Sequence, residues 1–199
     1  MRVHALIPVK GLADAKSRLM PLLTEDARAT LMIEMLRHVV EAARESAVLA
    51  RITVVSPDPA VLELATTWEV AALRQRTVGL NPGLDEARAD AIARSAEAIL
   101  VLHADLPRLR PDEITAMVHA LASPPAVVIA PDHTQSGTNA LLIAPPGALP
   151  FHFGPGSLAL HIAAAERNDL IFAIARAPGM AGDVDTPHDL REFVGNRRG

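Results

Sequence analysis

Residues 99–130 read ILVLHADLPRLRPDEITAMVHALASPPAVVIA, and this stretch decides the fold class. An apolar run at 99–103 is followed by a segment of helical period at 112–121 and by a second apolar run at 126–130. Strands that alternate with helices in this way are typical of a parallel sheet covered by helices. We therefore predict an α/β fold of three layers, in which a mostly parallel sheet is flanked by helices.

The rest of the chain repeats this alternation. Apolar or β-branched runs predict further strands at Val3–Val9, Arg51–Ser56, Val70–Leu73, Asn139–Ala144 and Ile171–Ala175. Segments of helical period predict helices at Glu25–Arg44, Pro59–Trp68, Leu84–Ala98 and Ser157–Asn168, and a last helix begins near Thr186. No linker or repeat divides the chain, so we predict a single domain over residues 1–199, with only the terminal GNRRG loose.

Composition and charge exclude several classes of protein. The longest apolar runs are too short to cross a bilayer, and the N-terminal MRVHALIPV lacks the features of a signal peptide. The chain has no cysteine, which excludes disulfides and thiolate metal sites and fits a cytoplasmic protein. The net charge is -4 at pH 7, so we expect neither nucleic acid nor an anionic membrane as the main partner.

The loop after the first predicted strand concentrates the lysines of the chain. It reads PVKGLADAKSRL (residues 8–19, here called the lysine loop) and holds both lysines, whereas the other seventeen basic residues are arginines. Ligands of parallel α/β sheets bind beyond the carboxyl ends of the strands. Lys10, Lys16 and Arg18 can clamp a polyphosphate there, although their spacing is not that of a P-loop. The alternative is a solvated loop whose lysines only keep it soluble.

Acidic residues stand at two further loops of the same kind. Asp105 follows the apolar run that ends in VLHAD, and Asp185 precedes a helix in DVDTP. Carboxylates delivered to one edge of a sheet suit a hard divalent cation, so these residues predict a Mg²⁺ site, with Asp183 as the reserve ligand. Each aspartate has an alternative role in a turn or a helix cap.

A glycine-rich segment, GPGSLA at 154–159, formally matches the dinucleotide fingerprint G-x-G-x-x-A. The match is weak, because no acidic residue follows the next strand to bind a ribose. Backbone amides at a helix N-terminus, together with the Ser157 hydroxyl, favour a site for one phosphate or carboxylate instead. A plain Gly-Pro turn with a serine cap is the alternative.

The histidines and the segment SGTN are less informative about function than the motifs above. Thr138 and Asn139 introduce a strand and have an alternative role as turn residues. The histidines lack a metal-ligand spacing, and no G-x-S-x-G elbow is present. We expect His103 to pack beside the sheet and His152 and His161 to approach the glycine-rich loop, without a catalytic histidine.

Taken in order, five motifs resemble the 2-phospho-L-lactate guanylyltransferase family, which includes the phosphoenolpyruvate and 3-phospho-D-glycerate guanylyltransferases of coenzyme F-420 biosynthesis. The motifs span Pro8–Leu190 and read IPVKxxxxAKSRL, HADLP, SGTNAL, FGPGS with a later His, and DVDTPxDL. The resemblance implies a nucleotide-diphospho-sugar transferase fold of the glycosyltransferase-A, Rossmann-like type. It also implies a GTP-dependent nucleotidyltransferase that transfers GMP to a small phosphorylated carboxylic acid and releases pyrophosphate.

The same resemblance implies roles for individual residues. The nucleotide would be bound by Pro8, Lys10, Lys16, Gly83, Leu84 and Asp85, with Lys16, Arg18 and Asp105 as catalytic residues. Mg²⁺ would be held by Asp105 and Asp185, with Asp183 in reserve. An excursion at 131–160 would bind the acceptor through Thr138, Asn139, Gly154, Gly156 and Ser157. The family usually has Asn at position 85, so the Asp here removes an amide donor and leaves the base preference open.

Several alternatives stay open at this stage. The acceptor is phosphoenolpyruvate, 2-phospho-L-lactate or 3-phospho-D-glycerate, and an alanine- and arginine-rich composition favours the first over the second. Another nucleotidyltransferase of this fold and a non-catalytic nucleotide-binding protein are further alternatives, and a homodimer is one alternative for the oligomeric state. The main spatial prediction is that Lys16 and the acidic residues converge on one rim, with a triphosphate-sized gap between them.

Overall fold

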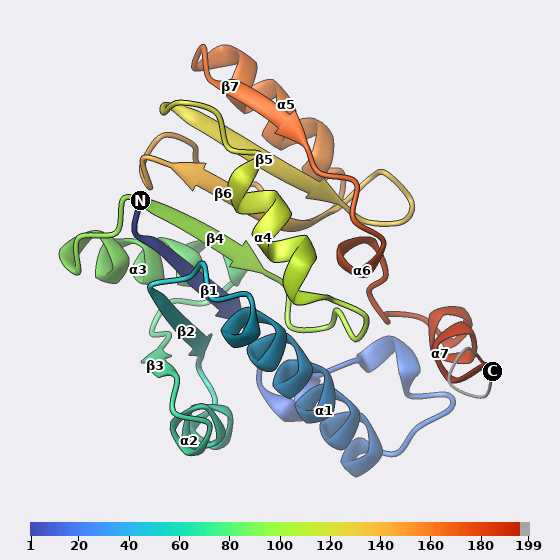
Figure 1. Cartoon of the computed structure of the whole chain (residues 1–199). Helices are drawn as coiled ribbons and strands as arrows, with labels where there is room; N and C mark the ends of the chain where they lie inside the picture. Colours follow the sequence, from blue (N-terminus) through green and yellow to red (C-terminus); the bar gives the residue numbers. More distant parts are fainter. Residues whose placement is uncertain (196–199) are drawn as a thin grey trace.

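A seven-stranded sheet forms the centre of the protein (Figure 1). The structure is a computed structural model and describes residues 1–195. The strands are β1 (Val3–Pro8), β2 (Arg51–Ser56), β3 (Ala71–Arg74), β4 (Ala98–Leu102), β5 (Ala126–Pro131), β6 (Thr138–Ala144) and β7 (Ile171–Ile174), in the order β3-β2-β1-β4-β6-β5-β7. Only β6 runs antiparallel to its neighbours, β4 and β5. The predicted mostly parallel sheet is confirmed.

Helices cover both faces of the sheet and complete three layers (Figure 1). The helices α1 (Glu25–Glu45), α2 (Pro59–Thr67) and α4 (Pro111–His119) share one apolar core with the sheet, and α3 (Leu80–Ala93) and α5 (Ser157–Arg167) share the other. In β4, Leu100 and Leu102 belong to the first core, and Ile99 and Val101 belong to the second. Successive side chains of a strand point to opposite faces, so a continuously apolar run is what a central strand between two helical layers requires.

The predicted element boundaries agree with the structure to within about two residues, except in α3. This helix begins at Leu80 instead of Leu84 and ends at Ala93 instead of Ala98. Gly79 enters it with φ 104°, a conformation that favours glycine, and a proline is tolerated in the first turn because that N–H has no helical partner. Ser95, with φ 60°, lies just beyond its end, and Ala98 already belongs to β4.

Three short helical turns were not predicted from the sequence, because a segment of so few residues cannot display a helical period. They are η1 (Leu12–Asp14), η2 (Ser17–Leu19) and α6 (Pro178–Ala181). The last helix, α7 (Pro187–Gly195), follows Thr186 as predicted. Residues 196–199 of the segment expected to be loose lie outside the described residues. Within residues 1–195, no helix has both the length and the apolar character that crossing a membrane requires.

The direction of β6 brings its first residues to the edge of the sheet where β1, β4 and β5 end. Thr138 pairs with Pro131 at the end of β5, and Ala140 pairs with Leu102 at the end of β4. The range 131–160, expected as an acceptor-binding excursion, therefore includes an internal strand of the sheet. The antiparallel turn places Thr138 and Asn139 beside the loops that follow the parallel strands.

A glycine in α6 determines how closely the C-terminal segment approaches α4. The Gly179 N–H donates to Glu113 Oε1 at 2.8 Å, and a Cβ at Gly179 would overlap the Arg108 carbonyl. We expect Gly179→Ala to lower the free energy of unfolding by about 1–3 kcal/mol, as overpacking does. Urea denaturation measures this, with Gly147→Ala as the control, because a Cβ there would meet no atom within 4 Å. Equal unfolding free energies for the two variants would contradict the claim that close packing at Gly179 excludes a side chain.

Candidate functional site

Lys16 joins distant parts of the chain at the carboxyl edge of the sheet. Its Nζ donates to Asp105 Oδ2 at 2.5 Å and to Asp185 Oδ1 at 2.7 Å. Asp105 follows β4, and Asp185 stands two residues before α7. The predicted convergence of lysine and carboxylates is present, and we call these three residues the lysine bridge. The predicted triphosphate-sized gap is absent, because the opposite charges pair directly.

Two members of the lysine bridge, Lys16 and Asp105, are largely shielded from water, whereas the Asp185 side chain is 43% exposed. The Lys16 side chain is only 4% exposed and that of Asp105 is 19% exposed. Burial alone would lower the pKa of Lys16, but the charges of Asp105 and Asp185 outweigh it and raise this pKa above its ordinary value. Burial likewise disfavours ionised Asp105, yet the Lys16 ammonium holds the pKa of that carboxyl below its ordinary value. Both groups are therefore charged at neutral pH.

Arg28 and Asp58, which belong to none of the predicted motifs, hold the backbone of the lysine loop in place. Lys16 has φ 51° and ψ 40°, a left-handed conformation that is uncommon for a residue with a Cβ. Arg28, which is 7% exposed, donates from Nε to the carbonyl of Ala15 at 3.2 Å. Asp58 Oδ2 accepts from the Leu12 N–H at 2.9 Å. Sequence reasoning missed both, because an arginine within a helix and an aspartate before a helix have commoner roles.

Three aspartates around Lys16 give the site an excess of negative charge. Asp183 Oδ1 accepts from Asn139 Nδ2 at 3.0 Å. Burial raises the pKa of Asp183, and repulsion from Asp105 and Asp185 raises it further. Asp105 Oδ1 is buried and has no hydrogen-bond partner within the described residues. Such oxygens are the ligands that Mg²⁺ prefers, although no three acidic or histidine side chains in residues 1–195 are already arranged to hold a metal.

The other two cations of the lysine loop remain accessible. The Arg18 side chain is 73% exposed, and its Nη1 lies 3.7 Å from Asp185 Oδ2. Lys10 is exposed, one residue after Val9, whose N–H donates to the carbonyl of Val55 at 2.8 Å. The loop thus combines one buried ammonium group with two cations at the surface.

Residues 153–157 (FGPGS, here called the anion loop) lead into α5. Gly154 and Gly156 have φ values of 132° and 70°, conformations that a side chain would strain. Ser157 is the first residue of α5 and is 2% exposed. The next N–H, that of Leu158, donates to the carbonyl of Ser136 at 3.2 Å. This bond places the start of α5 beside the segment that leads into Thr138.

Asn81 fixes the anion loop from α3 and was missed by sequence reasoning. Its Nδ2 donates to the carbonyl of Phe153 at 3.0 Å, and its Oδ1 accepts from the Phe153 N–H at 2.9 Å. The two residues are 72 positions apart, so no local pattern could have revealed the pair.

Thr138 and Asn139 are both buried, with different partners. Thr138 Oγ1 lies 3.0 Å from His161 Nδ1. Asn139 Nδ2 donates to Asp183 and to the carbonyl of Met180, the latter at 3.0 Å. Asn139 therefore positions a carboxylate and α6, whereas Thr138 belongs to the surroundings of the anion loop.

The three residues predicted near the guanine have unequal surroundings. A Cβ at Gly83 would overlap the side-chain amide of Gln75. Leu84 is fully buried in the core shared by α3 and the sheet. Asp85 is 53% exposed and forms an ion pair with Arg88. Of these three residues, only Asp85 presents a polar side chain to solvent.

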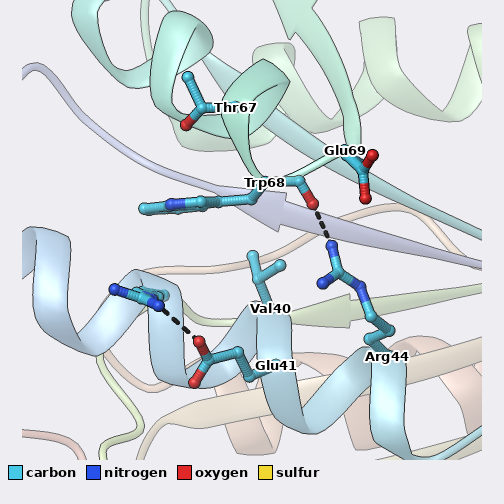
Figure 2. A pocket seen from close by; sticks show the side chains of 7 residues that line it. Val40, Glu41, Arg44, Thr67, Trp68 and Glu69 are labelled. Atoms are coloured by element: carbon cyan, nitrogen blue, oxygen red, sulfur yellow. Dashed lines mark hydrogen bonds and ion pairs between the residues drawn. The ribbon is translucent and has the colours of Figure 1, made fainter.

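A separate hollow of about 180 Å³ lies away from the lysine bridge (Figure 2). Residues 37–44 of α1 form one side, and Thr67, Trp68 and Glu69 form the other. In Figure 2, the Arg44 guanidinium donates to the carbonyl of Trp68. The hollow lies near the start of β3, at the amino edge of the sheet, and contains none of the predicted site residues.

The chain is similar to known proteins over nearly its whole length. The family described as "Guanylyl transferase CofC like" matches residues 3–197. A phosphoenolpyruvate guanylyltransferase of Rubrobacter xylanophilus is 49% identical over 190 residues, covering 96% of this chain and 92% of the relative. Another protein of that name, from Sphaerobacter thermophilus, is 42% identical over 196 residues, covering 98% and 94%.

Solved structures support the predicted fold type. A nucleotidyl transferase from Methanothermobacter superposes with a TM-score of 0.70 at 14% identity, covering 100% of this chain and 99% of the other. A CMP:2-keto-3-deoxy-manno-octonic acid synthetase complexed with CTP superposes with a TM-score of 0.68 at 17% identity, covering the same shares. At such identities the likeness concerns the fold alone.

Proposed function

The chain belongs to the CofC-like family of guanylyl transferases, and from this premise we propose that it transfers GMP from GTP to phosphoenolpyruvate. It is a nucleotidyltransferase, which removes a non-catalytic role from the alternatives. The observation that supports the proposed acceptor most is the 49% identity to a relative named phosphoenolpyruvate guanylyltransferase. The family implies that the product serves coenzyme F-420 biosynthesis.

The reaction needs positioning and charge more than a strong base. An oxygen of the acceptor phosphate attacks the α-phosphorus of GTP, a P–O–P bond forms, and the bond to the bridging oxygen of the β-phosphate breaks, releasing pyrophosphate. A phosphate monoester has a second pKa of about 6 and is largely ionised at neutral pH. Such an acceptor therefore needs no strong general base to become a nucleophile.

The lysine loop would bind the nucleotide. Lys16 provides a positive charge that is already held in position, and such preorganised charge stabilises the negative charge that develops on the phosphate oxygens in the transition state. Arg18 and Lys10 are accessible to the phosphates at the rim. Nucleotide binding requires Lys16 to release at least one carboxylate, because direct ion pairs now fill the expected gap.

Mg²⁺ fits the acidic side of the site. The unpartnered Asp105 Oδ1, together with Asp183 and Asp185, provides hard oxygen ligands with excess negative charge. Bound there, the ion would neutralise charge that develops on the phosphates. Asn139 would keep Asp183 in position through its 3.0 Å hydrogen bond.

A panel of acceptors tests the proposal. Enzyme, GTP and Mg²⁺ are incubated separately with phosphoenolpyruvate, 2-phospho-L-lactate and 3-phospho-D-glycerate, and products are identified by mass. We expect guanylylated phosphoenolpyruvate and pyrophosphate as the main products. If the enzyme turned over another acceptor but not phosphoenolpyruvate, the proposed acceptor would be wrong and the proposed reaction type would stand. ATP and CTP, tested in place of GTP, measure the base preference of the enzyme, which the Asp at position 85 leaves open.

A further inference from the structure

His161 is a buried histidine that the proposed chemistry does not use. It lies in α5, one turn after Ser157, and is fully buried. Its ring packs edge-on against Phe153 of the anion loop, with the ring centroids 4.9 Å apart. Its two nitrogens have partners of different kinds, and these partners determine where the ring proton resides.

The partners of His161 assign its tautomer. The backbone N–H of His152 can only donate, and it lies 3.0 Å from His161 Nε2, so Nε2 must be the unprotonated acceptor. Burial lowers the pKa of His161 to about 4, and the charges of His152 and His103 act in the same direction. The ring is therefore neutral at physiological pH, and its single N–H must be on Nδ1.

The tautomer of His161 in turn orients Thr138. Because Nδ1 carries the proton, it donates to Thr138 Oγ1 across their 3.0 Å separation. The threonine oxygen is then an acceptor in this bond, and its own hydroxyl proton must be directed elsewhere. Thr138 is 2% exposed, and no described residue is recorded as the acceptor of that proton. A buried hydroxyl proton without an acceptor is costly, so the site favours an incoming oxygen ligand.

We propose that His161 is a positioning residue that directs the Thr138 hydroxyl proton towards an anionic oxygen of the bound phosphorylated acid. This inference rests on the proposed function, because that function places the acceptor at Thr138. The hydrogen-bonded chain from the His152 N–H through His161 to Thr138 is fixed by the backbone at one end and finishes, among the described residues, in a hydroxyl proton without an acceptor at the other. It converts a hydroxyl that could either donate or accept into an obligatory donor for an anion.

Two amide substitutions separate this role from packing. The amide of an asparagine reaches about as far as Nδ1 of a histidine, whereas that of a glutamine reaches about as far as Nε2. Both variants lose the ring, but only His161→Asn keeps an N–H donor for Thr138. We expect His161→Gln to raise KM for phosphoenolpyruvate at least about tenfold with little change in KM for GTP, and His161→Asn to remain within about threefold of the wild type.

Further measurements complete the test. Thr138→Val should raise KM for phosphoenolpyruvate like His161→Gln, and the double variant should show no additional loss. Equal effects of the Asn and Gln variants, or additive losses in the double variant, would overturn the proposal. If the wild type transfers nothing to phosphoenolpyruvate, the proposed function fails. In that case the ¹⁵N NMR spectrum of the wild-type protein still tests the tautomer of His161. A ring protonated on Nδ1 at neutral pH supports the inference, and a ring protonated on Nε2 overturns it.

Discussion

Replacing Lys16 with alanine should lower the rate of guanylyl transfer by about 10²–10³-fold, which is the usual effect of removing one preorganised charge from a transition state. Its Nζ is the only recorded ion-pair partner of Asp105 within the described residues and is nearly inaccessible to water. Arg18 is not positioned to replace it, because Arg18 is at the surface and its one ion pair within residues 1–195 is with Asp185. Steady-state turnover of GTP and phosphoenolpyruvate measures the effect.

The Lys16→Ala variant should still fold. Its free energy of unfolding should fall by about 1–3 kcal/mol, because Asp105 loses its partner while Asp185 stays partly solvated. Circular dichroism at the assay temperature separates this loss from the loss of rate. Arg37→Ala is the control, because Arg37 forms an exposed ion pair with Glu41 in α1. A folded Lys16→Ala enzyme with wild-type turnover would exclude Lys16 from the mechanism.

Replacing Asp105 with asparagine should lower turnover by a similar factor, about 10²–10³-fold, through a different group. The substitution preserves shape but removes one negative charge and the unpartnered oxygen proposed as a Mg²⁺ ligand. We therefore expect the remaining activity to require a higher Mg²⁺ concentration than the wild type. A titration of initial rate against Mg²⁺ measures both changes.

Asp112→Asn is the matched control for this experiment. Asp112 is 65% exposed and pairs with Arg110, so its loss should leave the unfolding free energy and the Mg²⁺ dependence nearly unchanged. An Asp105→Asn enzyme with the Mg²⁺ dependence of the wild type would show that Asp105 is not a ligand, even if its turnover were reduced.

The fold was predictable because each central strand is an apolar run between two helical layers. The run Ala98–Leu102 supplies both cores at once, and only a buried strand of such a sheet requires this pattern. The position of β6 was harder, because the antiparallel insertion between β4 and β5 depends on long-range pairing. The early start of α3 at Leu80 was missed, although Pro82 lies in its first turn, where a proline is compatible with a helix.

The candidate site was predictable where strand ends carry unusual residues. Lys16, Asp105 and Asp185 converge as expected, because parallel strands and their loops end at one edge. The supporting contacts of Arg28, Asp58 and Asn81 were not predictable, because each depends on tertiary distance rather than on a motif. The role of His161 depends on two hydrogen bonds to opposite sides of one ring, which no sequence pattern records.

The central claim is that the lysine bridge is where the triphosphate and the metal meet. A crystal structure of the protein with a non-hydrolysable GTP analogue and Mn²⁺, located by its anomalous signal, tests it most directly. We predict Mn²⁺ at Asp105 and Asp185, with Lys16 moved from at least one carboxylate onto a phosphate oxygen. Metal and triphosphate bound elsewhere, with both Lys16 ion pairs intact, would contradict the account.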